Sequence, residues 1–141
     1  MPKMEIPEGH LLTEANEDYL EAILRVEEES GSTPEEGIRS VDVAEKLHVS
    51  KASVNKALST LREQGFIEQA RYGKVILTSE GRRYAEDVWR THRTIRQFLH
   101  AELGVPFERA DEEACTMEHA LSKDTMARWL AHLEANGISI E

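Results

Sequence analysis

The sequence is poor in cysteine and has no long hydrophobic run. Its single cysteine, Cys115, excludes an internal disulfide framework and suits a reducing cytosol. No apolar run reaches the roughly 18 residues that a membrane span needs. The segment from Met1 to Leu12 lacks the apolar core and the small-residue cleavage site of a signal peptide. These absences predict a cytoplasmic protein that does not enter a membrane.

The sequence signatures of common enzymes are also absent. The 141 residues contain no nucleophile motif and no phosphate-binding glycine loop, and they leave no room for a substrate domain. The chain is nevertheless long enough to bury a core without disulfides or a structural metal. Its composition, 40% hydrophobic and 31% charged, is that of an ordinary globular protein. We therefore expect a protein of one domain or two small ones that is not an enzyme.

The formal net charge of −10 argues at first against binding to nucleic acid, but the basic residues are unevenly distributed. From Lys46 to Arg83 the chain has eight basic and three acidic residues, a net charge of +5, so the remainder carries −15. Contact with phosphates requires a local basic surface, and the global sum matters less. This basic segment is therefore the candidate DNA-binding region.

Hydrophobic periodicity predicts a mainly α-helical fold with one β-hairpin. Helices are expected over residues 13–29, 41–47, 51–64 and 79–103, then one that ends near residue 121 and one over 123–135. Ser40, Ser50 and Ser122 are the expected N-caps, because a serine hydroxyl accepts a hydrogen bond from the first helical turn. Two short β-like runs, 66–70 and 74–78, flank a small turn.

The segment from Val41 to Leu77 combines a helix, a tight turn, a second helix and the hairpin, an order typical of a winged helix-turn-helix. The outward face of the second helix carries side chains that suit phosphates and base edges in the major groove. The candidate DNA-binding residues are Lys51, Ser53, Asn55 and Lys56 on that helix and Arg71 and Lys74 on the hairpin. A solvated basic helical hairpin is the plainer alternative, but the complete order of elements is more specific than a charge run.

Three groups of residues have side chains that can bind a metal. Asp18 and Glu21 share one face of the first helix, and His92 falls within the apolar stripe of the fourth. On the fifth helix Cys115, Glu118 and His119 stand at i, i+3 and i+4, so all three project from one side. Carboxylate, imidazole and thiolate together can coordinate a first-row divalent metal. Alone, Cys115 would usually be a small buried hydrophobe, and a reactive thiol is the other reading.

Taken together, the DNA-binding segment and the candidate metal ligands make the chain resemble a known family. It is similar to the metal-dependent repressors typified by the diphtheria toxin repressor and the manganese transport regulator. The resemblance covers about Glu14 to Leu133. It is carried by NEDYLEAIL, VDVAEKLHVSKASVNKALSTLREQGFI, VILTSEGRRYA, the histidine at position 92 and EACTMEHALS, in this order. The joint order of these blocks is specific, whereas each block alone is weak.

The resemblance implies a winged helix domain followed by a helical dimerisation and metal-binding domain. We expect a flexible arm over residues 1–12, the DNA-binding domain over 13–79 and the helical domain over 80–141, with the dimer seam on the last two helices. Some relatives carry a further SH3-like domain, for which this chain ends too early, as in the manganese branch. The implied partners are a double-stranded DNA operator and a second copy of the chain.

The resemblance also implies a set of metal ligands, which is a hybrid of two branches. Asp18 and Glu21 match the manganese branch, whereas the iron branch has methionine at the position of Asp18. His92, Glu118 and His119 match ligands in both branches. Cys115 agrees with the iron branch, since the manganese branch has glutamate there. Two further iron-branch ligand positions hold Arg96 and Asp111 in this sequence.

These features predict a metal-dependent repressor of metal homeostasis genes. Oxygen ligands favour Mn(II) or Fe(II) as the signal, while a thiolate shifts the preference toward Fe(II), Co(II) or Zn(II). The alternative is a winged helix regulator that ignores metals and senses oxidants through Cys115. That alternative predicts a lowered thiol pKa and DNA binding without metal dependence.

Overall fold

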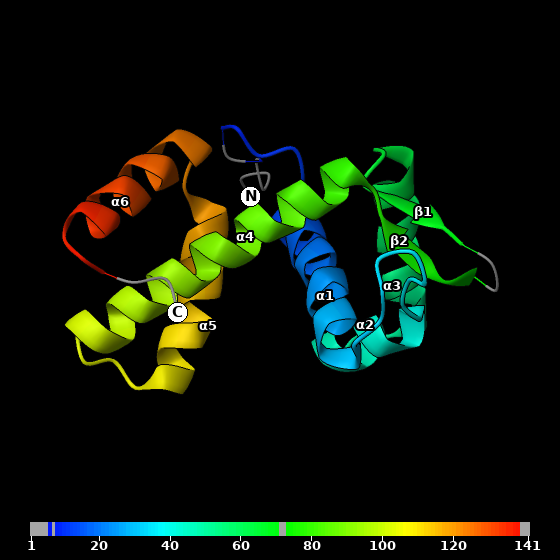
Figure 1. Ribbon diagram of the computed structural model, residues 1–141, viewed down its shortest axis with the longest axis horizontal. Coiled ribbons are helices and arrows are strands. Elements are labelled where there is room, and N and C mark those ends of the chain that lie inside the picture. Colours follow the sequence, from blue (N-terminus) through cyan, green and yellow to red (C-terminus); the bar gives the residue numbers. More distant parts are fainter. Residues whose placement is uncertain (1–5, 7, 71–72, 139–141) are drawn as a thin grey trace, which may run out of the picture. The chain divides into compact units, whose positions relative to one another are not determined.

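A computed structural model of the protein describes residues 6, 8–70 and 73–138 (Figure 1). The chain divides into two units, one formed by residues 15–86 and the other by residues 87–141 together with 1–14. The boundary falls within the longest helix, α4 (Ser79–Gln97). Among the described residues, no helix has the length and apolar character that crossing a bilayer requires.

The unit 15–86 is built from helices and one two-stranded antiparallel sheet. Its elements are α1 (Glu14–Ser30), α2 (Ser40–Leu47), α3 (Lys51–Glu63), β1 (Ile67–Gln69), β2 (Val75–Leu77) and the beginning of α4. In the sheet Ile67 pairs with Leu77 and Gln69 with Val75, which is the register of a hairpin. Helix, turn, helix and hairpin therefore follow one another as predicted, and the mainly helical winged fold is confirmed.

The turn between α2 and α3 is fixed by two local interactions. His48 ends α2 in the left-handed region at φ 56°, a conformation that terminates helices. Ser50 then caps α3, because its Oγ accepts a hydrogen bond from the backbone N–H of Ser53 at 3.1 Å. The predicted cap Ser40 is wrong: it is the first residue of α2, and the N-cap is Arg39, whose guanidinium bonds Asp42 instead.

The core of this unit comes from apolar residues that recur at helical spacing on α1 and α3. Leu20, Ile23, Val54 and Leu61 are all almost completely buried. Close packing also explains Gly81, since a Cβ at this position would lie 1.8 Å from the carbonyl oxygen of Phe66. The backbone just before β1 and the start of α4 therefore lie in close contact.

A partly buried ion pair joins α4 to α1 within the same unit. Arg82 on α4 donates two hydrogen bonds to the carboxylate of Glu27 on α1, at 2.8 and 2.9 Å. The Glu27 side chain is 8% exposed, so its charge depends on this partner. The hydrogen bond to Glu27 is the main reason why the pKa of Arg82 is raised above its usual value.

The second unit is helical. After α4 come a π-helical turn, η2 (Phe98–Glu102), and two further helices, α5 (Phe107–Ala120) and α6 (Lys123–Ala135). The single α-helix predicted over residues 79–103 is therefore interrupted, because its last turn widens to π geometry. Ser122 caps α6 as expected, accepting a hydrogen bond from the N–H of Thr125 at 3.1 Å. A core cluster of Ile95, Leu99, Ala110, Ala114 and Met126 joins the helices.

Part of the predicted flexible arm packs against this helical unit. The carbonyl of Glu8 accepts a hydrogen bond from the N–H of Lys123 at 2.9 Å. The ring Nε2 of His10 lies 2.7 Å from the carbonyl oxygen of Leu121, and His10 is buried. Residues 8 to 10 are thus fixed to the junction of α5 and α6, whereas residues 1–5 and 7 lie outside the described part of the chain.

Candidate metal centre and DNA-binding surface

Helix α5 brings three of the predicted ligands together. Cys115, Glu118 and His119 each offer one ligand atom, and these atoms lie within 4.8 Å of one another. Glu118 and His119 are buried and Cys115 is partly buried. Their spacing of three and four residues explains the arrangement, because such positions lie above one another on one side of an α-helix.

His92 reaches the same cluster from α4. Its Nδ1 lies 3.4 Å from one carboxylate oxygen of Glu118, while Nε2 of His119 lies 3.2 Å from the other. Each oxygen of Glu118 therefore faces an imidazole nitrogen. The side chain of Glu118 is 1% exposed, and within the described residues neither oxygen accepts a hydrogen bond of good geometry.

This arrangement fits a divalent cation. A buried carboxylate is costly unless a positive charge or hydrogen-bond donors compensate it. Imidazole nitrogens, a carboxylate and a thiolate are all ligands of first-row transition metals. Within the helical unit, the donor set of His92, Cys115, Glu118 and His119 thus has the chemistry and the proximity of a metal centre.

Asp111 and Arg96 form a second layer behind His92. One oxygen of Asp111 lies 2.7 Å from Nε2 of His92 and 2.9 Å from Nη1 of Arg96. Burial alone would raise the pKa of Asp111, but the hydrogen bonds from His92 and Arg96 outweigh it and lower the pKa. In the sequence both residues stood out only as departures from the iron branch. Their helical spacing could have pointed to this role. Arg96 stands four residues after His92, and Asp111 stands four residues before Cys115.

The remaining predicted ligands, Asp18 and Glu21, lie on α1 in the unit 15–86. They are one helical turn apart, so they share a face as predicted. Glu21 is buried and Asp18 is partly buried. Their role as metal ligands remains a prediction.

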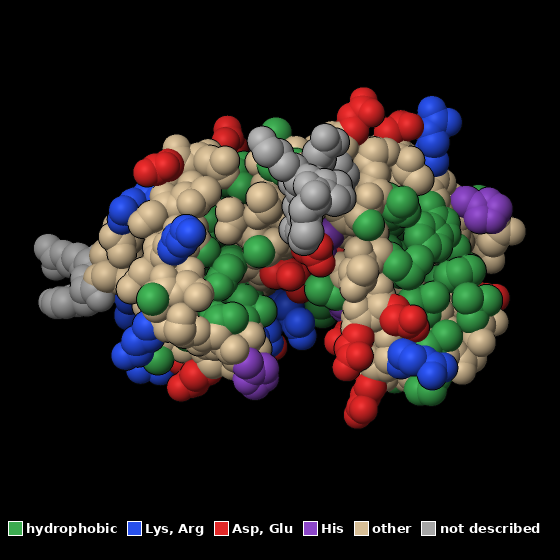
Figure 2. All heavy atoms as spheres, turned by 180° about the vertical axis from the view of Figure 1, so that it is seen from behind, with side chains coloured by type: hydrophobic (Ala, Val, Ile, Leu, Met, Phe, Trp, Pro, Cys, Tyr) green, Lys and Arg blue, Asp and Glu red, His purple; other side chains and the backbone are tan. Residues whose placement is uncertain are grey.

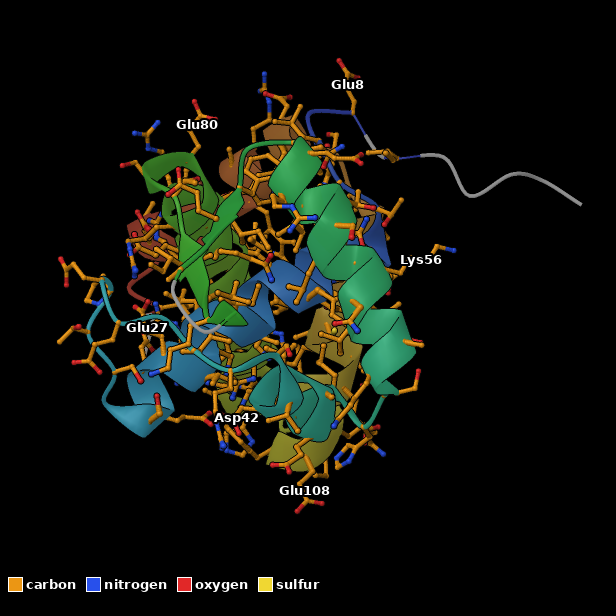
Figure 3. The ribbon with its side chains drawn as sticks, turned by 90° about the vertical axis from the view of Figure 1, so that its right-hand side faces the viewer. Glu8, Glu27, Asp42, Lys56, Glu80 and Glu108 are labelled. Carbon is orange, nitrogen blue, oxygen red and sulfur yellow. The ribbon has the colours of Figure 1, made fainter. Side chains whose placement is uncertain are left out.

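The predicted DNA-binding residues of α3 lie on its outer face. Lys51, Ser53, Asn55 and Lys56 are exposed, while Val54 is buried. In Figure 3 the side chain of Lys56 projects outward from α3. Ser53 has a local role as well, because its hydroxyl accepts a hydrogen bond from Ser50 at 3.0 Å.

A hollow beside α3 joins this face to the hairpin. Lys51 and Asn55 line it together with Lys74 at the base of β2. Arg39, at the start of α2, lines the same hollow and was missed, because the basic segment was counted only from Lys46. Three cations around one hollow suit a phosphate group. Arg71, the other predicted wing residue, lies outside the described residues.

Both halves of the chain match models of known protein families. Residues 11–75 match the family model of the iron-dependent repressor N-terminal DNA-binding domain. Residues 78–135 match the model of the iron-dependent repressor metal-binding and dimerisation domain. The cluster of candidate ligands on α4 and α5 falls inside the second match.

Similar proteins carry related names. The transcriptional regulator MntR of Salmonella typhimurium is 36% identical over 125 residues, covering 89% of this chain and 76% of the relative. The iron-dependent repressor IdeR of Mycobacterium leprae is 35% identical over 117 residues, covering 83% of this chain and 49% of the relative. The crystal structure of the metal-dependent transcriptional regulator MtsR superposes with a TM-score of 0.72 at 30% identity, covering 84% of this chain and 53% of that one.

This chain spans about half the length of the mycobacterial repressor and of the superposed structure. It covers 76% of the Salmonella regulator at 36% identity. The matches confirm the resemblance predicted from the sequence. The chain belongs to the iron-dependent repressor family and is a metal-dependent, DNA-binding transcriptional regulator, not an enzyme.

Proposed function

We propose that this regulator represses metal homeostasis genes in response to Mn(II) or Fe(II). The observation that carries the proposal is the buried carboxylate of Glu118, which faces one imidazole on each side. Oxygen and nitrogen donors suit Mn(II) and Fe(II), and the nearby thiol of Cys115 also accommodates Co(II) or Zn(II). A bound divalent ion would supply the positive charge that this acidic cluster lacks.

The proposed ligands are His92, Cys115, Glu118 and His119, joined by Asp18 and Glu21 of α1. The last two follow from the resemblance to the manganese branch. Without a cation, the acidic members of this set repel one another. A ligand set drawn from α1, α4 and α5 links metal occupancy to DNA affinity, and such linkage typically amounts to about 5–150-fold.

On the DNA side, α3 is the proposed recognition helix. Lys51, Ser53 and Asn55 lie near its start, where side chains of a recognition helix contact base edges. Lys56, Arg71 and Lys74 are assigned to phosphates, which position the protein without reading sequence. A homodimer would place two such helices on operator half-sites about one helical turn apart.

The proposed dimer seam lies on the helical unit. Figure 2 shows hydrophobic side chains gathered over a broad area of this unit. Partly buried hydrophobic residues surround its core cluster: Phe98, Val105, Met117, Leu121 and Trp129. A contiguous apolar patch on the surface often marks a site that a partner covers. A second copy of the chain is the proposed occupant.

The decisive experiment compares DNA binding with and without metal. Protein purified metal-free is titrated onto its operator in chelator and in micromolar Mn(II), Fe(II), Co(II) and Zn(II). Affinity should be at least several-fold higher with Mn(II) or Fe(II) than in chelator. Equal affinity in chelator and metal would reject the metal signal and favour an oxidant sensor that acts through Cys115.

A further inference from the structure

The imidazole of His92 has a carboxylate beside each of its ring nitrogens. Nε2 lies 2.7 Å from the carboxylate of Asp111, and Nδ1 lies 3.4 Å from that of Glu118. The ring also stacks on Trp89, with centroids 5.5 Å apart and planes 13° from parallel. The contact with Asp111 and the stacking on Trp89 set the position and the rotation of the ring.

The contact with Asp111 determines which nitrogen carries the proton. A carboxylate accepts hydrogen bonds and cannot donate them, so Nε2 of His92 must be the N–H that points to Asp111. In the neutral imidazole the other nitrogen, Nδ1, then carries the lone pair. Nδ1 is the atom that faces Glu118, so the lone pair is directed into the candidate metal centre.

We infer that Asp111 is a positioning residue, which holds His92 with Nδ1 available as a ligand, and that Arg96 holds Asp111 in turn. The inference rests on the proposed metal function of Glu118 and His92. A carboxylate behind a ligating histidine fixes its tautomer and ring orientation and raises its basicity. Asp111 thus acts through His92 and is not itself a ligand.

Arg96 holds Asp111 beside Nε2 of His92, the ring nitrogen that does not face Glu118. Its guanidinium bonds the same oxygen of Asp111 at 2.9 Å and lies over the ring of Phe107, 4.9 Å from the centroid. The negative charge of Asp111 is therefore already neutralised by a fixed cation. A second divalent ion beside Asp111 would be repelled by that guanidinium. No second ion is therefore expected beside Asp111.

The test is a Mn(II) titration of the full chain, with free Mn(II) measured by electron paramagnetic resonance. Wild type should bind Mn(II). Asp111→Asn should bind the same number of ions as wild type, with a dissociation constant higher by about 10–100-fold, as for other changes behind a ligating histidine. Asp111→Glu keeps a carboxylate and should lie nearer to wild type than Asp111→Asn.

Asp124→Asn is the matched control. Asp124 lies on α6 in the same unit and also bonds an arginine, with Arg128 Nε at 2.9 Å. The substitution makes the same change in net charge but touches no ligand, so Mn(II) affinity should stay within twofold of wild type. Thermal unfolding in chelator checks that each variant is folded before its affinity is compared.

Two outcomes overturn the inference while leaving the metal function intact. One is Mn(II) affinity in folded Asp111→Asn equal to that of wild type. The other is a second ion bound by wild type and lost in Asp111→Asn, which would make Asp111 a ligand. Failure of the metal function itself is recognised separately, by wild type that binds no Mn(II), Fe(II), Co(II) or Zn(II).

A measurement without metal tests the positioning directly. Nitrogen-15 NMR of the metal-free protein, at a pH where the imidazole is neutral, reports which ring nitrogen of His92 is protonated. The Nε2–H tautomer should dominate in wild type, and the Nδ1–H form should increase in Asp111→Asn. A dominant Nδ1–H tautomer in wild type would contradict the inference whatever the metal titration shows.

Discussion

Nδ1 of His92 lies 3.4 Å from a carboxylate oxygen of Glu118, and both side chains are buried. The two residues come from different helices, α4 and α5, and are 26 positions apart in the chain. A lone-pair nitrogen facing a carboxylate oxygen is unfavourable unless a cation or a proton lies between them. A cation bound between His92 and Glu118 would remove this unfavourable contact.

Glu118→Gln removes the charge at the middle of the cluster while keeping the shape of the side chain. Mn(II) affinity should fall by more than the ~10–100-fold typical of a change behind a ligand. The metal-free protein should be no less stable than wild type, because a buried carboxylate is replaced by a neutral amide. The two measurements are a Mn(II) titration and thermal unfolding in chelator. Unchanged affinity would remove Glu118 from the ligand set.

Cys115→Glu replaces a soft ligand by a hard one. If the thiolate is a ligand, the response to Mn(II) should improve and the responses to Co(II) and Zn(II) should weaken. Thiolate ligation expels a proton, so wild-type affinity should climb with pH until the thiol is ionised. Most of that slope should vanish in the variant, because glutamate is already ionised at neutral pH.

Metal titrations of wild type and Cys115→Glu at two pH values, with thermal unfolding alongside, test this prediction. If the Cys115 side chain packs only as a hydrophobe, the glutamate is buried without a partner. The melting temperature would then drop sharply while the order of metal preference stayed the same, and the ligand role of the thiol would be rejected.

Lys74→Ala and Asn55→Ala separate phosphate contact from base contact. Loss of Lys74 should weaken binding to all sequences about equally and reduce the salt slope by about one. Loss of Asn55 should relax sequence preference, with a cost of ~1–3 kcal/mol on the preferred operator only. Binding to a panel of operators at several salt concentrations distinguishes the two. Identical behaviour of both variants would show that the assigned face of α3 is wrong.

Arg82→Met should destabilise the unit 15–86 strongly. It leaves the carboxylate of Glu27, 8% exposed, without its arginine partner. Breaking a buried pair in this way costs about 3–5 kcal/mol, and the partial exposure of Arg82 favours the lower end. Arg128→Met is the control, because its pair with Asp124 is exposed and contributes well under ~1 kcal/mol. Denaturant unfolding of both variants in chelator gives the comparison, and equal losses would contradict it.

Several features of the fold were readable from single positions in the sequence. Ser50 and Ser122 cap their helices because a serine hydroxyl can reach the N–H three residues ahead, whatever surrounds it. The cluster of Cys115, Glu118 and His119 was equally readable, since helical spacing alone puts them on one side of α5. Ser40 failed as a cap because Arg39 and Asp42 bond each other at the start of α2.

The sequence by itself determined the helices, the winged order of elements and the side of α5 that carries the ligands, because all of these depend on residues a few positions apart. Only the tertiary structure decided which residues meet across helices. His92 faces Glu118, Asp111 bonds both His92 and Arg96, and Arg82 bonds Glu27. These pairs are 15 to 55 positions apart. Periodicity assigns a residue to a face, but the packing of that face against another helix selects its partner.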